Sequence, residues 1–390
     1  MSRVDTFFAL LKSQPKQIPL VLRDKVVANS LYLQLARVFR RVLQRPDAYQ
    51  RAFYSSVKAR IVHRYKEQFG RVPNLKNPTS FSEKAQWRKL YCPDIKEIAK
   101  IVDKRRAYEY ARTVVDEKHL LPIEKVLTGK IVASDISSLG DGVVIQPTHR
   151  SGQVFIIERQ EDVDSAVIAD KLNIMLKWPY SMASHEPWYG RSEPAAIVRK
   201  LIKNSDGSPY LNDLKIHVFP QPRGNFKYIC WVQNRNPSWR AMFDEDFQPL
   251  NFRWNMTYPP PDFDIPKPEG FDQMLEYARE LAKPFDYARV DFMLGAKEFY
   301  FTEVTFASGG GVQKADPPEM DEVIGSWWHL DTGNFLKRMW WFTRTWLPLW
   351  RTERPMRNVR RLHRFRSEWG IPSVTPRNYQ RIEQIADCNE

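Results

Sequence analysis

Residues 287–311 read YARVDFMLGAKEFYFTEVTFASGGG, and this stretch decides the fold. Two apolar runs, 287–294 and 298–305, flank a Gly-Ala-Lys turn and predict an antiparallel hairpin. Asp291 and Glu303 lie inside the two runs. An ionised carboxylate in an apolar strand is costly unless it is paired or binds a metal.

The two carboxylates predict a magnesium site, because Mg²⁺ favours a few carboxylates together with phosphate oxygens. Arg289, two residues before Asp291, is expected on the same side of its strand, where it can meet a phosphate. The alternative is a buried Arg–Asp–Glu cluster without a ligand. We favour the metal interpretation.

Composition indicates a folded protein of two or three domains, with 390 residues, 43% hydrophobic and 13% aromatic. No apolar run reaches the roughly 18 residues that a membrane span needs, and we expect no secretory signal. The three cysteines, Cys92, Cys230 and Cys388, are far apart and predict neither disulfides nor a zinc site. These features predict a cytoplasmic protein.

The net charge of +14 comes from the two ends of the chain. Residues 1–70 contain 14 Lys/Arg and 4 Asp/Glu, residues 331–390 contain 12 and 6, and the middle contains 34 and 36. Basic ends favour an anionic partner. Because no nucleic-acid motif is recognised, we expect no nucleic acid, but a glycan or an anionic membrane surface.

Strand and helix patterns mix irregularly along the chain, which predicts an α+β fold. We expect a basic helical region over 1–71, a catalytic body over 72–330 and a basic, Trp-rich tail over 331–390. Thr79 or Ser80 with Glu83 predicts a capped helix. Helices are expected over 81–90, 96–115 and 270–281, and strands over 142–146, 154–157, 196–202, 214–219 and 226–232.

The tail predicts an amphipathic helix that Pro348 limits in length. Its apolar residues recur at helical spacing among basic ones: Phe335, Met339, Phe342, Trp346 and Leu349. Such a helix suits the headgroup layer of an anionic membrane, at the inner face of the plasma membrane. Docking of the Trp face on the body is the alternative.

Five motifs precede or form the hairpin, in a fixed order: Asp103-Lys104, GVVIQPTHRSGQVFII, AAIVRKLI, LNDLKIHVF and RVDF…FTEVTFASGGG. Together with NPTSFSEKAQWRKLY they resemble the TupA-like (teichuronopeptide-biosynthesis) family of the ATP-grasp superfamily. The resemblance covers roughly residues 72–311. It implies an ATP-grasp fold, in which two α+β lobes clamp ATP, here with helical N- and C-terminal extensions.

The resemblance implies roles for individual residues. Asp291 and Glu303 match the Mg²⁺ ligands, Arg289 faces the transferred phosphate, and Thr305 stands at the position of an extra ligand. The residues expected to bind the nucleotide come from a helix start, a flexible loop and an Asp-x-Lys strand: Lys104, Gln146, His149, Arg150, Ser151, Gly152, Asp213 and Lys215.

The resemblance also implies the chemistry of a ligase that joins a carboxylate to an amine. With ATP and Mg²⁺ as cofactors, the enzyme would activate the carboxylate as an acyl phosphate, which the amine attacks. The substrate would be a cell-surface polysaccharide or its lipid-linked precursor. Replacing Asp291 or Glu303 by Ala is expected to abolish turnover with little loss of fold.

The chain departs from the family pattern around the nucleotide. Gln146 replaces a lysine, and losing a charge-assisted phosphate contact costs about 1.5–3 kcal/mol. Arg150, within an altered loop, can return that charge. Arg199-Lys200 replaces the usual hinge carboxylate.

Two alternative functions follow from these departures. One is a degenerate ATP-grasp protein that binds an acidic glycan or a partner without catalysis. The other is a metal-dependent transferase that uses a nucleotide sugar, for which the Asp-x-Asp pattern of Asp262 and Asp264 is a weak signal.

Overall fold

The computed structural model describes residues 46–151, 154–177, 180–203, 211–235, 237–295 and 298–352. Residues 57–349 form one compact unit, and residues 46–56 and 350–352 belong to a second unit. The helices expected within 1–45, and the tail beyond residue 352, lie outside the described residues. The boundaries expected near residues 72 and 330 stay predictions.

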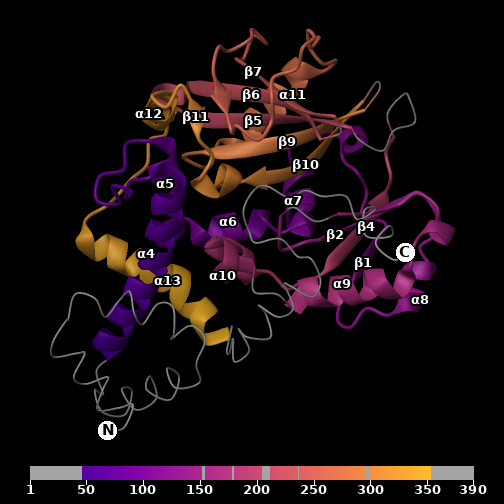
Figure 1. The fold of residues 1–390 in the computed structure, drawn as a ribbon, viewed down its shortest axis with the longest axis horizontal. Helices are drawn as coiled ribbons and strands as arrows, with labels where there is room; N and C mark the ends of the chain where they lie inside the picture. The colour runs from indigo at the N-terminus through magenta and orange to yellow at the C-terminus, as the bar shows by residue number, and fades with distance from the viewer. Residues whose placement is uncertain are drawn as a thin grey trace. The chain divides into compact units, whose positions relative to one another are not determined.

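Two antiparallel sheets organise the compact unit (Figure 1). The larger has the order β10-β9-β5-β6-β7, and the smaller has the order β1-β4-β2-β3. The larger sheet consists of β5 (Asn212–Pro220), β6 (Phe226–Arg235), β7 (Ser238–Phe243), β9 (Ala288–Leu294) and β10 (Phe299–Thr305). The smaller sheet consists of β1 (Lys125–Leu127), β2 (Val143–Pro147), β3 (Phe155–Ile157) and β4 (Ala196–Lys200). Separately, β8 (Arg253–Trp254) pairs with β11 (Ala315–Asp316). The predicted strands and the α+β class are therefore confirmed.

The larger sheet buries a continuous apolar face. Leu214, Ile216, Val290 and Phe292 pack there with three helices, α6 (Ile95–Ile101), α7 (Lys104–Ala111) and α11 (Phe271–Ala282). Because side chains alternate along a strand, the residues between them face the other way. That opposite face carries the polar residues of the hairpin.

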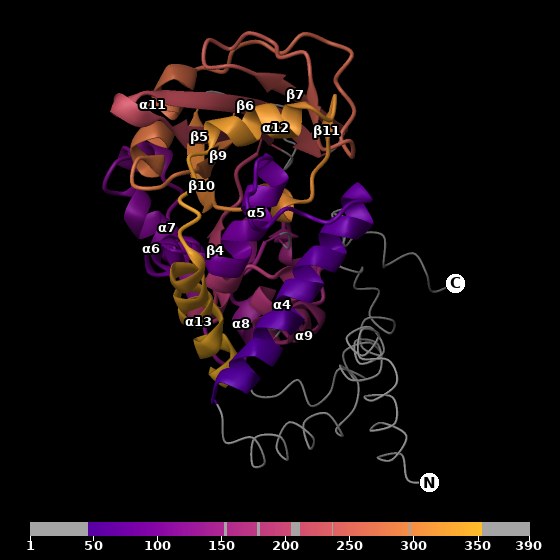
Figure 2. The same ribbon diagram turned by 90° about the vertical axis from the view of Figure 1, so that its left-hand side faces the viewer.

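Helices α5 (Phe81–Tyr91) and α12 (Met320–Trp327) are neighbours, as Figure 2 shows. Phe81 of α5 packs in an aromatic core with Trp231, Trp254 and Trp328. The predicted cap of α5 is confirmed, since Ser80 Oγ accepts a hydrogen bond from the Glu83 N–H at 3.3 Å. The Glu83 carboxylate in turn accepts from the Thr79 N–H at 3.2 Å.

The predicted single helix over 96–115 is wrong, because the chain breaks it at Val102 and Asp103. Asp103 has an extended backbone, with ψ of 129°, and its carboxylate accepts from the N–H groups of Arg105 and Arg106. It is thus the N-cap of a new helix, and this start places Lys104 at the first position of α7.

The smaller sheet packs one face on α8 (Ala133–Ser137) and α9 (Ser165–Lys177), where Ile145 and Val198 are buried. The register pairs Gln146 with Ile197 and Val144 with Arg199, so these residues share the opposite face. Two short elements follow α9, namely α10 (Tyr180–Ser184) and the 3₁₀ helix η3 (Pro187–Arg191).

The N-terminal helix α4 spans Pro46–Phe69, and the tail helix α13 spans Phe335–Thr352 with Pro348 inside it. Phe342, Trp346 and Leu349 of α13 are buried. Trp346 Nε1 donates to the carbonyls of Lys89 and Leu90 at 3.2 and 3.1 Å. In the described ranges, no helix combines the length and apolar character needed to cross a bilayer.

Candidate nucleotide and metal site

A β-bulge positions the two hairpin carboxylates. Phe301 pairs with Phe292, and continuing that register would set Thr302 opposite Asp291. Instead the register shifts, and Glu303 pairs with Asp291. Thr302 is the extra residue, and its Oγ1 donates to the Asp291 carbonyl at 2.9 Å. The bulge therefore brings Glu303 to the same face as Asp291.

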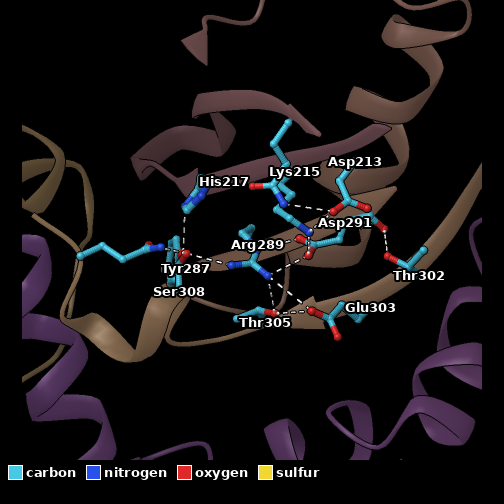
Figure 3. A network of polar contacts seen from close by, with 12 residues as sticks. Asp213, Lys215, His217, Tyr287, Arg289, Asp291, Thr302, Glu303, Thr305 and Ser308 are labelled. Atoms are coloured by element: carbon cyan, nitrogen blue, oxygen red, sulfur yellow. Dashed lines mark hydrogen bonds and ion pairs between the residues drawn. The ribbon is translucent and has the colours of Figure 1, made fainter. Parts of the chain in front are cut away.

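Arg289 is the centre of the polar network in Figure 3. Its Nε and Nη2 donate to the two oxygens of Asp291 at 2.6 and 2.7 Å, a bidentate ion pair. Nη2 also reaches Glu303 Oε1 at 3.4 Å and Thr305 Oγ1 at 3.1 Å, and Nη1 donates to Ser308 Oγ at 2.9 Å. The predicted convergence of Arg289, Asp291 and Glu303 is thus present.

Lys215 of β5 lies opposite Asp291 in register and completes the cluster. Its Nζ is 2.7 Å from Asp291 Oδ2 and 3.6 Å from Asp213 Oδ2. Gln233 Nε2 donates to Asp213 at 3.0 Å, and Arg240 donates to the Gln233 side-chain oxygen at 2.6 Å. Sequence reasoning missed Gln233 and Arg240, because both lie outside the strands that it expected.

These contacts decide the protonation states. Burial would raise the pKa of Asp291, but Arg289 and Lys215 outweigh it and hold the pKa below its usual value. Burial would likewise lower the pKa of Arg289, but Asp291 outweighs it and raises that pKa. Asp291 is therefore an anion held by two cations, with only 1% of its surface exposed.

The loop between β2 and β3 is anchored by Lys104. The Lys104 Nζ donates to the carbonyls of Pro147 and Arg150 at 3.3 and 2.7 Å. Burial lowers the pKa of Lys104, Glu303 raises it and Arg199 lowers it further, so the lysine lies within electrostatic range of both sheets. In the same loop, His149 is buried and Ser151 is half-buried. Gly152 lies outside the described residues.

Unpartnered donors in and beside this loop fit an anionic group such as the phosphates of a nucleotide. Within the described residues, the buried atoms Thr148 Oγ1, Arg150 Nε and Arg199 Nε have no hydrogen-bond partner. Arg199 is 5% exposed and lies on the face of β4 that Gln146 shares, whereas Lys200 is exposed. Of the two hinge cations, only Arg199 thus lies on this face.

The hairpin carboxylates are of the type and number that Mg²⁺ binds, although both oxygens of Asp291 are engaged by Arg289 and Lys215. Where the chain is described, no group of three or more His, Cys, Asp or Glu residues could hold a metal. Mg²⁺ needs only one or two carboxylates when phosphates and waters supply the rest. The Glu303 side chain is 28% exposed, and among the described residues its partners all contact Oε1, with Arg289 at 3.4 Å and Thr305 at 3.5 Å. Glu303 therefore has an oxygen available for a cation.

Other polar motifs have structural roles. His217 is fully buried, and its Nδ1 lies 3.0 Å from the Tyr287 hydroxyl, as expected for a core histidine. The Asp244 carboxylate accepts from the N–H groups of Asp246 and Gln248 in a turn. Asp262 and Asp264 are exposed.

Several solved structures resemble this chain weakly. One is the biotin carboxylase domain of Hydrogenobacter thermophilus 2-oxoglutarate carboxylase, in complex with MgADP, ADP and bicarbonate. It has 15% sequence identity and a TM-score of 0.32, and the match covers 54% of this chain and 40% of that chain. The D-alanine–D-alanine ligase from Helicobacter pylori has 12% identity and a TM-score of 0.37, over 68% and 69%. The Bacillus anthracis enzyme has 16% identity and a TM-score of 0.33, over 65% and 69%. Similarities this low carry no argument.

The comparison with curated protein sequences finds no match. The profile described as TupA-like ATPgrasp, however, matches residues 83–328, more than half of the chain. This span contains Lys104, the loop after β2, Lys215 and the whole Arg289 network. The chain belongs to the TupA-like ATP-grasp family, as its motifs predicted.

Proposed function

We propose that this protein is an ATP- and Mg²⁺-dependent ligase that joins a carboxylate to an amine through an acyl phosphate. Membership of an ATP-grasp family supports ATP-dependent ligation in general terms. The observation that carries the proposal is the cross-strand set of Asp291, Glu303 and Lys215 around Arg289. Phosphoryl transfer needs such fixed charges more than covalent help from the protein.

Each residue of the set has a defined task in this proposal. Arg289 is held by Asp291, Thr305 and Ser308, so its guanidinium is preorganised toward the charge of a transferred phosphoryl group. Lys215 adds a second cation, and Lys104 holds the loop over the phosphates. Asp291 and Glu303 would hold Mg²⁺, which neutralises phosphate charge when bound.

The substrate would be a cell-surface polysaccharide or its lipid-linked precursor, modified at the inner face of the plasma membrane. The basic ends of the chain support this placement, since acidic glycans and anionic lipids both attract cations. Localisation in the cytoplasm and transient contact with the membrane are part of the proposal.

The test variant is Glu303→Gln rather than Asp291→Ala. Removing Asp291 takes away the closest ion-pair partner of the buried cations Arg289 and Lys215, which costs about 3–5 kcal/mol of stability. We therefore expect Asp291→Ala to destabilise the fold, which would make a loss of turnover in that variant ambiguous. Glu303 is partly exposed and weakly bonded, so its amide isostere keeps the fold and removes the charge.

Calorimetric titration of ATP in the presence of Mg²⁺ tests the proposal. The wild type should bind with micromolar affinity, and Glu303→Gln should bind about tenfold more weakly or worse, because it loses a metal ligand. Glu298→Gln, an exposed carboxylate beside the turn of the same hairpin, should match the wild type. Absence of ATP binding to the wild type would point to a repurposed fold, and nucleotide sugars and acidic glycans would be titrated next.

A further inference from the structure

Arg199 is a buried cation of β4, on the face of the smaller sheet that Gln146 shares. The register pairs Arg199 with Val144 and Gln146 with Ile197, so Arg199 and Gln146 are diagonal neighbours on adjacent strands. Diagonal neighbours lie about 7–8 Å apart, within reach of a long side chain. A cation on β4 thus lies beside the position at which β2 carries a neutral residue instead of a lysine.

Arg199 has no anion to offset its charge among the described residues. Its Nε has no hydrogen-bond partner there, and its guanidinium forms no ion pair. Burial lowers the pKa of Arg199 to about 10, and the Tyr108 hydroxyl acts in the opposite direction. A phenol is uncharged at neutral pH, so it does not balance the guanidinium. Because a buried charge without a counter-ion is costly, this position favours an anionic ligand.

Two other cations of this region have contacts of their own. Lys104 Nζ donates to two loop carbonyls at 3.3 and 2.7 Å. The Arg150 guanidinium lies over the Tyr180 ring, with its Cζ atom 5.3 Å from the ring centroid. Burial lowers the pKa of Lys104, and Arg199 and Arg150 lower it further, so both arginines lie within electrostatic range of the lysine that anchors the loop.

The donors around Lys104 suit an anion with several oxygens. Thr148 Oγ1 and Arg150 Nε are buried and, like Arg199 Nε, have no partner among the described residues. These donors come from two different segments, the loop after β2 and the strand β4. A chain of phosphates offers enough acceptor oxygens for all of them, and arginine binds phosphate through strong, charge-assisted hydrogen bonds.

We propose that Arg199 binds the phosphates of the nucleotide and supplies from β4 the positive charge that Gln146 does not supply from β2. This inference rests on the proposed function and adds a specificity-determining residue to the same site. The departure at Gln146 and the departure at Arg199 are then one change, in which the cation moves from one strand to its neighbour on the same face of the sheet.

The experiment moves the charge back. Arg199→Met removes the guanidinium and leaves no polar atom in its place, and Gln146→Lys puts a cation on β2. The wild type, both single variants and the double variant are titrated calorimetrically with Mg·ATP and with Mg·pyrophosphate, which carries phosphate charge without a base or a ribose. Lys200→Met, at the exposed neighbour of Arg199, is the matched control.

Arg199→Met should bind both ligands about tenfold or more weakly than the wild type, the factor expected from one charge-assisted contact, whereas Lys200→Met should not. Adding Gln146→Lys to Arg199→Met should restore most of the loss. In the presence of Arg199, the same lysine should raise the affinity by a smaller factor, because the charge is already supplied. Equal gains in the two backgrounds, or wild-type affinity of Arg199→Met, would overturn the proposal.

Urea unfolding without ligand separates binding from a structural role. Arg199→Met should unfold at the same urea concentration as the wild type or at a higher one, because it removes a buried charge that has no counter-ion. A lower midpoint would show that the fold itself pairs Arg199, and the proposal would fail.

The two ligands separate this inference from the proposed function. If Arg199→Met weakens the binding of Mg·ATP but not of Mg·pyrophosphate, Arg199 contacts the base or the ribose, and the inference is overturned while the ligase proposal stands. If the wild type binds Mg·pyrophosphate but not Mg·ATP, the ligase proposal fails, and the pyrophosphate comparison still decides the role of Arg199. A wild type that binds neither ligand defeats both.

Discussion

At the residue scale, His149 links the loop after β2 to the stability of the fold. Burial, Arg150 and Lys104 lower its pKa to about 4, and Asp103 acts in the opposite direction. An unfolded histidine titrates near 6.5. Because the folded pKa is the lower one, the unfolded chain binds the proton first, and stability falls as the pH drops from about 6.5 towards 4.

We predict that lowering the pH from 7 to 5 reduces the free energy of unfolding in both proteins, and that the reduction is roughly 2 kcal/mol larger for the wild type than for His149→Gln. Urea unfolding of both proteins at both pH values measures this. The buried His185 and His217, whose pKa values are also lowered, contribute equally to the two proteins and cancel. An identical loss in the two proteins would contradict the prediction.

The bulge at Thr302 shows which part of the site the sequence alone could not predict. The hairpin, its two carboxylates and the position of Arg289 follow from alternation along β9. A regular hairpin, however, would pair Asp291 with Thr302, and only the register shift brings Glu303 alongside. No local residue signals that shift, because it depends on how both strands pack in the sheet.

At the element scale, the contact between α12 and α5 leaves no room for a side chain. A Cβ atom on Gly325 would lie 2.2 Å from the Thr79 carbonyl oxygen and 2.6 Å from the Phe81 nitrogen. Lys84 Nζ donates to the Gly325 and Trp328 carbonyls, each at 2.7 Å, which fixes the two helices together. The clash is with backbone atoms, which cannot rotate away.

We therefore predict that Gly325→Ala destabilises the fold by about 1–3 kcal/mol, the range for overpacked cores. Glu322→Ala, on the exposed side of the same helix, should stay within about 0.5 kcal/mol of the wild type. The midpoints of urea unfolding give both values. The prediction would be contradicted if Gly325→Ala unfolded at the same urea concentration as the wild type, because α12 would then be free to shift on α5.

Helices and strands differ in how readily the sequence reveals them. Most strands of the two sheets were predicted because their apolar runs are short and bounded by turn residues, but β1 and β7 were missed. Helix α9 was missed, although Ile168, Leu172 and Met175 have helical spacing and are buried.

At the scale of the whole molecule, the two ends of α13 have different surroundings. Phe342, Trp346 and Leu349 are buried, so this part of the helix docks on the body. Phe335, Leu336 and Trp340 remain 72%, 75% and 56% exposed. Aromatic and leucine side chains beside basic residues favour the headgroup layer of an anionic membrane. We infer that this exposed N-terminal end of α13 is the part available to lipid.

Deleting the tail is a poor test of that idea, since it also removes the buried Trp346. We predict instead that the full chain with Phe335→Ser, Leu336→Ser and Trp340→Ser loses co-sedimentation with phosphatidylglycerol vesicles and keeps wild-type stability. The variant Val126→Ser with Val132→Ser, which removes exposed apolar side chains elsewhere, should still sediment. Vesicles of neutral phosphatidylcholine should retain less wild-type protein, because the basic ends contribute through charge. Undiminished sedimentation of the triple variant would assign any membrane contact to another part of the chain.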